Sequence, residues 1–391
     1  MGHIMLIVQK MLWREDKHQS LFLSSPANKI KIVYKKPLEH KAVKEMNTMW
    51  DSYADKLQDQ LMGRFWNQEK QIFNSASDLP FDKNSQPFNY WWYAHTVDVL
   101  IDGYIRTQKE DFVEKIIILI ESVKRYNDDS LINDYYDDME WMALALLRMY
   151  EQTKADYFKN KVFTLWTDIK TAWNEHMGGG MAWRKTQLDY KNTPANAPAA
   201  ILAARLYRNF HDETDLEWAQ KIYEFNKKKL VNSETGFVYD GINRLGDGEI
   251  DKDWKFTYCQ GVFIGAAIEL HAITKEERYL EDARKTVTAT LNQLVNAQGL
   301  LQDEGGDDAG LFKGILVRYL TLYYQQYQDG KVKSLLLYNA EQMKAAIQPD
   351  QLIGTSWEQP KEQTQLSTYL SGMMLVESAA ILEKDFGKIK V

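Results

Sequence analysis

The residues best suited to chemistry in this chain are two adjacent aspartates, Asp137 and Asp138, at the start of an apolar helical run. They stand in the segment Tyr-Tyr-Asp-Asp-Met-Glu-Trp at 135–141, which surrounds them with aromatic side chains. Glycoside hydrolysis requires two carboxyl groups flanking one bond, about 5–5.5 Å apart when the anomeric configuration is retained. Neighbouring side chains at a helix start can meet that separation, so the pair is a candidate catalytic dyad.

An acidic first turn is the alternative interpretation of this pair. Free backbone N–H groups and the helix dipole stabilise carboxylates at that position, which accounts for one aspartate but not for the aromatic surroundings. Two other Asp-Asp pairs allow a comparison. Asp128–Asp129 lies in a turn-like Tyr-Asn-Asp-Asp-Ser segment and needs no function. Asp307–Asp308 follows two glycines and either caps a helix or lines the same site.

The elements that must position the pair are helices. Apolar residues recur at helical spacing along almost the whole chain, and strand-like alternation is rare outside Lys29–Lys35. The spacing predicts about twelve helices, near 40–65, 90–107, 111–126, 137–152, 155–174, 192–209, 214–231, 257–273, 276–295, 309–327, 331–346 and 363–384.

Every second predicted helix is poor in charge and rich in small residues, whereas its partner is amphipathic. The low-charge helices recur about every 47–65 residues, one helical hairpin per step, which indicates a repeat architecture. Polar and aromatic residues gather at the starts of these helices. We therefore expect an all-α fold, an (α/α)6 barrel in which those starts converge on one mouth. Residues 1–38 fall outside the pattern and are predicted to form a loosely attached N-terminal extension, with 39–391 as a single catalytic domain.

Polar and aromatic residues near the starts of the low-charge helices are candidates for substrate binding. Taken alone, most of them fit a purely structural role: an aromatic residue of the core, a histidine whose hydrogen bonds are satisfied, or a polar group at a helix start. Together, around one ring, they suit a lining that binds sugar hydroxyls and stacks on sugar rings. The glycines at 178–180 lack the pattern of a phosphate-binding loop. A simpler interpretation is that they permit a tight turn that presents the indole of Trp183. The candidates are Asn89, Trp92, His95, Tyr136, Trp183, Lys191, Asn192, Tyr258, Gln260 and Lys313.

Composition excludes several classes of function. The balance of 48 basic and 55 acidic residues gives a net charge of −7, which argues against general nucleic-acid binding. The single cysteine, Cys259, excludes an intramolecular disulfide and a cysteine-based zinc site. Metal-binding and cofactor motifs are absent, so neither a metal nor a cofactor is expected. The apolar run at 4–8 is too short for a signal peptide and no run is long enough to span a membrane; a cytoplasmic location is expected.

Six motifs, taken in order, resemble those of glycoside hydrolase family 76, the endo-α-1,6-mannanases. They are Phe-Asn-Tyr-Trp-Trp-Tyr-Ala-His from 88, Tyr-Tyr-Asp-Asp from 135, Gly-Gly-Gly-Met-Ala-Trp from 178, Lys-Asn from 191, Thr-Tyr-Cys-Gln-Gly from 257 and Phe-Lys-Gly-Ile from 312. The resemblance extends from about residue 45 to 385. It implies an (α/α)6 barrel that acts on α-linked mannan or manno-oligosaccharides. It also implies that Asp137 is the nucleophile and Asp138 the general acid/base of a retaining mechanism.

Two other functions fit the same barrel. A sugar epimerase or isomerase works by proton transfer and usually employs histidines at the mouth, where only His95 is well placed. A non-catalytic glycan-binding protein would keep the aromatic residues without needing both aspartates. No sequence feature indicates a subunit interface.

Overall fold

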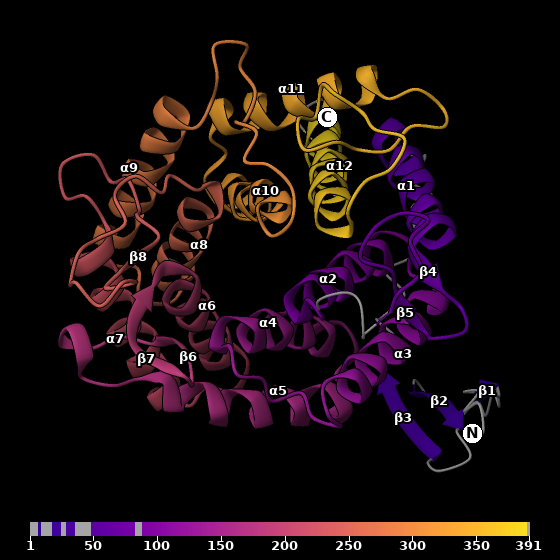
Figure 1. Cartoon of the computed structure of the whole chain (residues 1–391), viewed down its shortest axis with the longest axis horizontal. Helices are drawn as coiled ribbons and strands as arrows, with labels where there is room; N and C mark the ends of the chain where they lie inside the picture. The colour runs from indigo at the N-terminus through magenta and orange to yellow at the C-terminus, as the bar shows by residue number, and fades with distance from the viewer. Residues whose placement is uncertain (1–6, 9–17, 25–28, 36–47, 83–87, 389–391) are drawn as a thin grey trace.

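The fold is a closed ring of six helical hairpins, which confirms the predicted (α/α)6 barrel. The structure, a computed structural model, describes residues 7–8, 18–24, 29–35, 48–82 and 88–388. Each inner helix packs on the next, and the last packs on the first, so the ring closes (Figure 1). The inner helices are α2 (Tyr90–Thr107), α4 (Tyr136–Thr153), α6 (Thr193–Phe210), α8 (Thr257–Thr274), α10 (Ala309–Tyr327) and α12 (Leu366–Lys388).

The outer helices alternate with the inner ones along the chain and surround them. They are α1 (Met49–Phe65), α3 (Glu110–Tyr126), α5 (Asp156–Ile169), α7 (Glu213–Leu230), α9 (Glu277–Gln293) and α11 (Gly330–Ala346). Two predicted boundaries differ from the structure by five residues or more. The helix expected from 155 to 174 ends at Ile169 and continues as a 3-10 turn, Lys170–Ala172. The first helix begins at Met49 because Thr48 caps it: the Thr48 hydroxyl accepts from the Asp51 N–H at 3.1 Å, and the Asp51 carboxylate accepts from the Thr48 N–H at 3.2 Å.

The two kinds of helix owe their positions to their composition. In α3, Val113 and every residue from 116 to 120 are buried, whereas the charged residues of this helix remain partly or fully exposed. In α8, every residue from 257 to 270 is buried. Gly261 makes this packing possible, because a Cβ there would lie 2.7 Å from the Leu316 Cα of α10.

A cluster of four charged residues joins the middle and C-terminal halves of three inner helices, below the cleft-lining N-terminal ends. We call it the floor cluster: Asp98 and Asp102 on α2, Arg148 on α4 and Arg318 on α10. Arg148 pairs with both aspartates, at 2.7 Å to Asp102. Arg318 also pairs with both, at 2.8 Å each. The pairs neutralise charges that would otherwise lie uncompensated inside the barrel.

Short strands lie at the mouth and near the N-terminus. The strand predicted at 29–35 is present as β3 (Lys29–Lys35), which pairs antiparallel with β2 (His18–Ser24); β1 (Ile7–Val8) pairs with β2. Much of 1–38 lies outside the described residues, so the predicted division into an extension and a catalytic domain stays a prediction.

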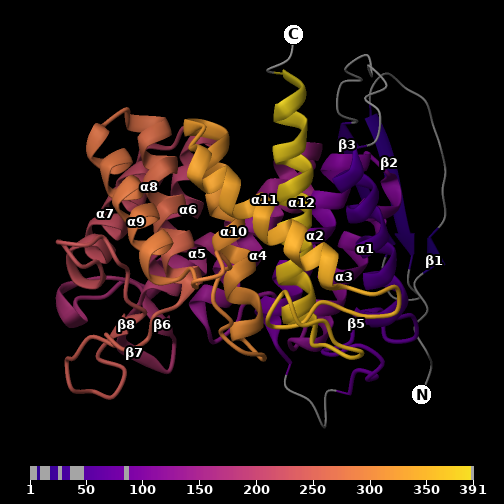
Figure 2. The same ribbon diagram turned by 90° about the horizontal axis from the view of Figure 1, so that it is seen from above.

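The sequence did not predict the remaining strands. One hairpin pairs β4 (Trp66–Asn67) with β5 (Ile72–Phe73), and a second sheet pairs β6 (Ala182–Arg184), β7 (Gln187–Asn192) and β8 (Gly241–Ile242). This second sheet lies on the side of the barrel where α12 begins, at the bottom of Figure 2. The strands are too short to show an alternating pattern.

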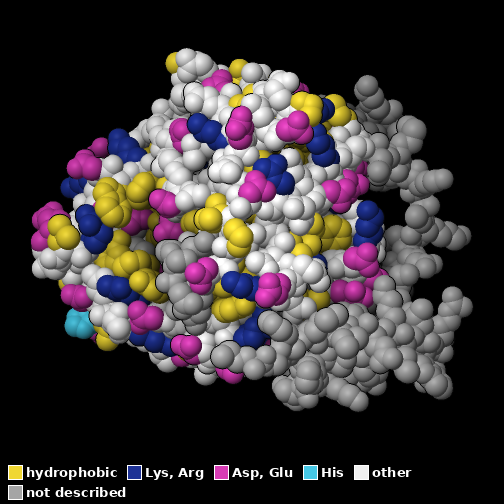
Figure 3. All heavy atoms as spheres, turned by 45° about the vertical axis from the view of Figure 1, so that its right-hand side comes forward, with side chains coloured by type: hydrophobic (Ala, Val, Ile, Leu, Met, Phe, Trp, Pro, Cys, Tyr) yellow, Lys and Arg dark blue, Asp and Glu magenta, His cyan; other side chains and the backbone are white. Residues whose placement is uncertain are grey.

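The outer surface carries mixed charge. On the face in Figure 3, basic and acidic side chains are interspersed with scattered hydrophobic ones. Within the described part of the chain, no helix is both long and apolar enough to cross a membrane.

Candidate active site

The N-terminal ends of five inner helices, α2, α4, α6, α8 and α10, surround a cleft of about 810 Å³. Aromatic side chains make most of its walls: Phe88, Tyr90, Trp91, Tyr135, Trp141, Trp183, Tyr190, Trp254, Phe256, Tyr258 and Phe312. Its polar lining contains Asn89, Asp137, Asp138, Asn192, Asp240, Arg244, Glu304, Asp307 and Asp308. Flat apolar faces beside polar groups suit a ligand that presents both C–H faces and hydroxyls.

Asp137 and Asp138 occupy the first turn of α4 and line this cleft together. The Asp137 carboxylate accepts hydrogen bonds from the Trp183 indole N–H at 3.1 Å and from the Asp138 backbone N–H at 3.0 Å. The Asp138 carboxyl accepts from the Asn133 side-chain amide at 2.6 Å. The two carboxyl groups are thus held by different donors.

The surroundings give the two carboxyl groups different acidities. Burial raises the pKa of Asp137 to about 7, although its two N–H donors oppose this rise. Burial also raises the pKa of Asp138, and the charges of Asp137 and Asp308 raise it further. Asp137 therefore ionises first and Asp138 retains its proton. A nucleophile and a general acid need this order.

Two further carboxyl groups in the cleft are tied to aromatic side chains. Asp240 accepts from the hydroxyls of Tyr258 at 2.7 Å and Tyr190 at 2.9 Å. Asp308 accepts from the indole N–H of Trp91 at 3.0 Å and of Trp92 at 2.9 Å. Each carboxyl group thereby fixes the orientation of two rings in or beside the cleft.

The charged residues that line the cleft are mostly acidic. Its described lining holds six carboxyl groups and one guanidinium, that of Arg244. Burial raises the pKa of Asp240 and Glu304, of the latter to about 7, so part of this acidity is neutralised by protons. A neutral polyhydroxyl ligand fits such a cleft, whereas a phosphorylated or carboxylated ligand would meet repulsion.

The structure brings six of the twelve predicted site residues into the cleft: Asn89, Asp137, Asp138, Trp183, Asn192 and Tyr258. Trp183 follows three glycines at 178–180, all with positive φ, and a Cβ on Gly180 would lie 2.3 Å from the Phe225 ring. These glycines make the turn that presents Trp183. Asn192 also caps α6, because its side chain accepts from the Ala195 N–H at 3.2 Å. Contact of any of them with substrate stays a prediction.

The other three aromatic candidates lie behind the walls of the cleft. Trp92 is buried and reaches the cleft through its hydrogen bond to Asp308. His95 packs against Trp141, with ring centroids 4.8 Å apart, and burial lowers its pKa to about 3, so the ring is neutral. The Tyr136 hydroxyl meets Thr171 at 3.1 Å, away from the cleft.

The three remaining polar candidates hold loop backbone. Lys191 donates to the Gly180 carbonyl and the Asn174 side chain, both at 2.8 Å. Gln260 exchanges two hydrogen bonds with the backbone of Val238, at 2.9 and 2.7 Å. Lys313 donates to the Thr355 carbonyl and lies over the Trp357 ring. Their contacts support the loops around the mouth.

Sequence reasoning missed several residues of the cleft. Asp240, Arg244 and Trp254 lie in the segment between α7 and α8, which lacks helical periodicity and so gave no clue to its orientation. Of the two alternatives for Asp307–Asp308, the structure supports a place at the mouth, since both line the cleft and Asp308 makes no side-chain cap.

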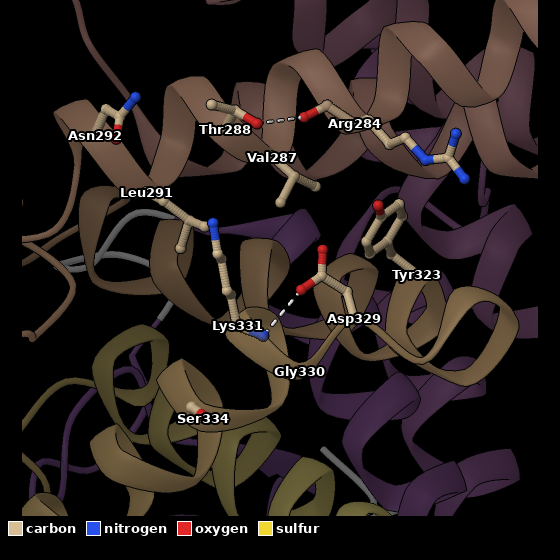
Figure 4. Close-up of a pocket in the computed structure, with 10 residues that line it drawn as sticks. All are labelled: Arg284, Val287, Thr288, Leu291, Asn292, Tyr323, Asp329, Gly330, Lys331 and Ser334. Carbon is tan, nitrogen blue, oxygen red and sulfur yellow. Dashed lines mark hydrogen bonds between the residues drawn. The ribbon is translucent and has the colours of Figure 1, made fainter.

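A second hollow, of about 990 Å³, lies on the outside of the barrel between α9, α10 and α11 (Figure 4). Its one carboxylate, Asp329, caps α11 by accepting from the Lys331 N–H at 2.9 Å. Tyr323, the aromatic residue of its lining, is buried. This hollow has neither a carboxyl pair nor an exposed ring, so the smaller cleft is the candidate active site.

Several known proteins are similar to this chain. The model of glycosyl hydrolase family 76 matches residues 49–387. The crystal structure of the Lin0763 protein from Listeria innocua is 41% identical, with a TM-score of 0.82 over 86% of this chain and 99% of that chain. The α-1,6-mannanase GH76A of Salegentibacter sp. HEL1_6 is 40% identical, with a TM-score of 0.80 over 85% of this chain and 99% of that chain. The matching structure is an inactive variant in which two consecutive aspartates are changed to asparagine. It is in complex with α-1,6-mannotriose.

A more distant relative is the mannan endo-1,6-α-mannosidase DCW1 of Saccharomyces cerevisiae, 22% identical over 293 residues. The match covers 67% of this chain and 64% of the yeast protein, so the chain spans less than two thirds of that relative.

Proposed function

Since this chain belongs to glycosyl hydrolase family 76, as its sequence motifs predicted, we propose that it hydrolyses α-1,6-mannosidic bonds in mannan or manno-oligosaccharides with retention of configuration. The observation that carries the proposal is the pair Asp137–Asp138 in an aromatic-lined cleft. The similar α-1,6-mannanase from Salegentibacter supports it, because exchange of two consecutive aspartates yields an inactive variant that binds α-1,6-mannotriose.

In the first step, the Asp137 carboxylate attacks the anomeric carbon while the bond to the leaving oxygen breaks. Asp138 gives its proton to that oxygen, so the shortened chain departs as a neutral alcohol. In the second step, a water molecule attacks the mannosyl-enzyme, Asp138 takes the water proton, and Asp137 is released as a carboxylate. The different acidities of the two groups support this division of roles.

The test is product formation from linear α-1,6-mannan and α-1,6-mannotetraose, with the first product anomer identified by NMR. We expect the wild type to release shorter α-mannosides, and Asp137→Ala and Asp138→Asn to lose at least a thousandfold in rate. The pair Asp128–Asp129, which lies in a turn before α4, provides a matched control: replacing both by asparagine should leave the rate unchanged. An inverted product would overturn the mechanism, and a wild type that cleaves neither substrate would overturn the proposed activity.

A further inference from the structure

Asn133, in the segment that precedes α4, makes two hydrogen bonds that fix the orientation of its side-chain amide. Its Oδ1 accepts from the Asp134 backbone N–H at 2.6 Å. Its Nδ2 donates to Oδ2 of Asp138, also at 2.6 Å. A flipped amide would set Nδ2 against the Asp134 N–H, two donors facing each other, so the assignment follows from the contacts themselves.

This orientation distinguishes the two oxygens of Asp138. An amide nitrogen only donates, so Oδ2 must accept. The carbonyl oxygen of a neutral carboxyl group accepts better than its O–H oxygen, so this bond favours the hydrogen on the other oxygen. Among the residues that the structure describes, none donates a hydrogen bond to Oδ1. The hydrogen of the neutral acid therefore belongs on Oδ1.

We propose that Asn133 is a positioning residue that reserves Oδ2 of Asp138 as an acceptor and thereby places the transferable proton on Oδ1. The inference rests on the proposed function. When the glycosidic bond breaks, the leaving oxygen takes the proton from Oδ1 and the electrons of that O–H bond remain on Asp138. The Asn133 N–H then meets a carboxylate, to which it bonds more strongly than to the neutral acid.

The segment around Asn133 is held in place by other residues. The Asn127 side chain donates to the carbonyls of Ser130 at 2.8 Å and Ile132 at 2.9 Å. The Tyr90 hydroxyl donates to the Leu131 carbonyl at 2.9 Å. Replacing Asn133 should therefore leave the segment folded, which separates its effect on Asp138 from a general structural effect.

Asn133→Ala is the deciding variant, because it removes the donor to Asp138 without adding a charge, whereas Asn133→Asp would place another carboxyl group beside Asp138. We expect kcat/KM for α-1,6-mannotetraose to fall about 10- to 100-fold. The loss should be at least fivefold smaller for a nitrophenyl α-1,6-mannobioside, whose leaving group needs little protonation. The Asn133 bond lowers the pKa of Asp138, so its loss should move the alkaline limb of the kcat/KM profile to higher pH.

Asn127→Ala is the matched control, since it loosens the same segment without touching a cleft carboxyl group. It should leave the alkaline limb in place. Asn133→Leu, which has nearly the shape of asparagine and no donor, should reproduce the shift if Asn133→Ala does not fold. Equal losses on both substrates, or an unmoved alkaline limb, would overturn the proposal. ¹³C NMR titration of the Asp138 carboxyl group measures its pKa without turnover. An unchanged pKa in Asn133→Ala overturns the inference, whereas an inactive wild type overturns the proposed function alone.

Discussion

The indole N–H of Trp183 donates a hydrogen bond to Oδ2 of Asp137 at 3.1 Å. The ring is held edge-on between Tyr135 and Tyr190, with centroids 5.1 and 5.6 Å away. A residue on strand β6 thus fixes the proposed nucleophile at the start of α4. Its N–H also opposes the rise in the pKa of Asp137 that burial causes.

Removing this donor should shift the acidic limb of activity. In Trp183→Phe, a smaller aromatic ring replaces the indole and the N–H is lost, so the pKa of Asp137 rises and the carboxylate forms only at higher pH. We expect the acidic limb of kcat/KM to move upward and the optimum to fall about tenfold. Trp173→Phe is the control, because its indole donates to Glu175 at 3.2 Å outside the cleft. A Trp183→Phe profile that superimposes on the wild type would contradict this role.

Glu140 should make the protein less stable as the pH rises. It is fully buried on α4, and burial, then the charge of Asp137, raise its pKa well above 4.5. The native state therefore keeps a proton that the unfolded chain loses above about pH 4.5, and the free energy of unfolding falls by up to about 1.4 kcal/mol per pH unit. Glu140→Gln stays neutral in both states. Urea unfolding at pH 5 and pH 8 should show that the variant loses less stability between them.

The exposed Glu341 on α11 is the control for this prediction. Glu341→Gln should follow the wild-type difference between the two pH values. If Glu140→Gln also follows it, the side chain is not protonated in the native state and the argument fails.

Two glycine-to-alanine changes in helices should have opposite effects. A Cβ on Gly261 would lie 2.7 Å from the Leu316 Cα, so α8 and α10 would have to move apart at a cost of about 1–3 kcal/mol. A Cβ on Gly63, in α1, meets nothing within 4 Å. Alanine there should stabilise the protein by about 0.5–1 kcal/mol through its helix propensity. Thermal unfolding of the two variants checks both signs, and a stable Gly261→Ala would show that the inner helices can separate at little cost.

The floor cluster should contribute strongly to stability. Arg318→Met leaves Asp98 and Asp102 with Arg148 alone, and we expect a loss of about 3 kcal/mol because charge remains inside the barrel. Arg278→Met on the outer surface breaks the ion pairs with Glu224 and Glu276, but its side chain is 41% exposed, and the cost should stay below about 1 kcal/mol. Urea unfolding gives both values. Equal costs would mean that solvent screens the floor cluster as well.

The barrel was predictable from the sequence because its signals are local and repeated. Small, uncharged helices alternate with amphipathic ones, and this pattern determines which helices are inside. Asp137 and Asp138 were also recognisable, since neighbours at one helix start stay together in any fold. Residues on long loops, such as Asp240 and Trp254, gave no such signal. Their place in the cleft depends on tertiary contacts, including the hydrogen bonds that join Asp240 to two tyrosines.

Polar residues at helix starts were harder to assign. In the sequence, Lys191 and Gln260 lie near the starts of inner helices and were therefore expected at the mouth. In the structure, each forms hydrogen bonds with the backbone of a neighbouring loop. A side chain at a helix start has loop backbone on one side and the cleft on the other. Spacing alone does not distinguish the two directions, because the partner lies elsewhere in the chain.

Trp254 should bind a sugar ring at the edge of the cleft. The Arg244 guanidinium lies 4.1 Å from the Trp254 ring centroid, and Asp251 holds Arg244 at 3.0 Å. Trp254 is 38% exposed, more than the other aromatic residues of the lining. Trp254→Ala should raise KM for α-1,6-mannotetraose about three- to tenfold and leave kcat nearly unchanged, because the stacking is equal in ground and transition states. Leu245→Ala changes the 73% exposed tip of the same loop and should alter neither constant. A fall in kcat with KM unchanged would instead place Trp254 beside the reacting bond.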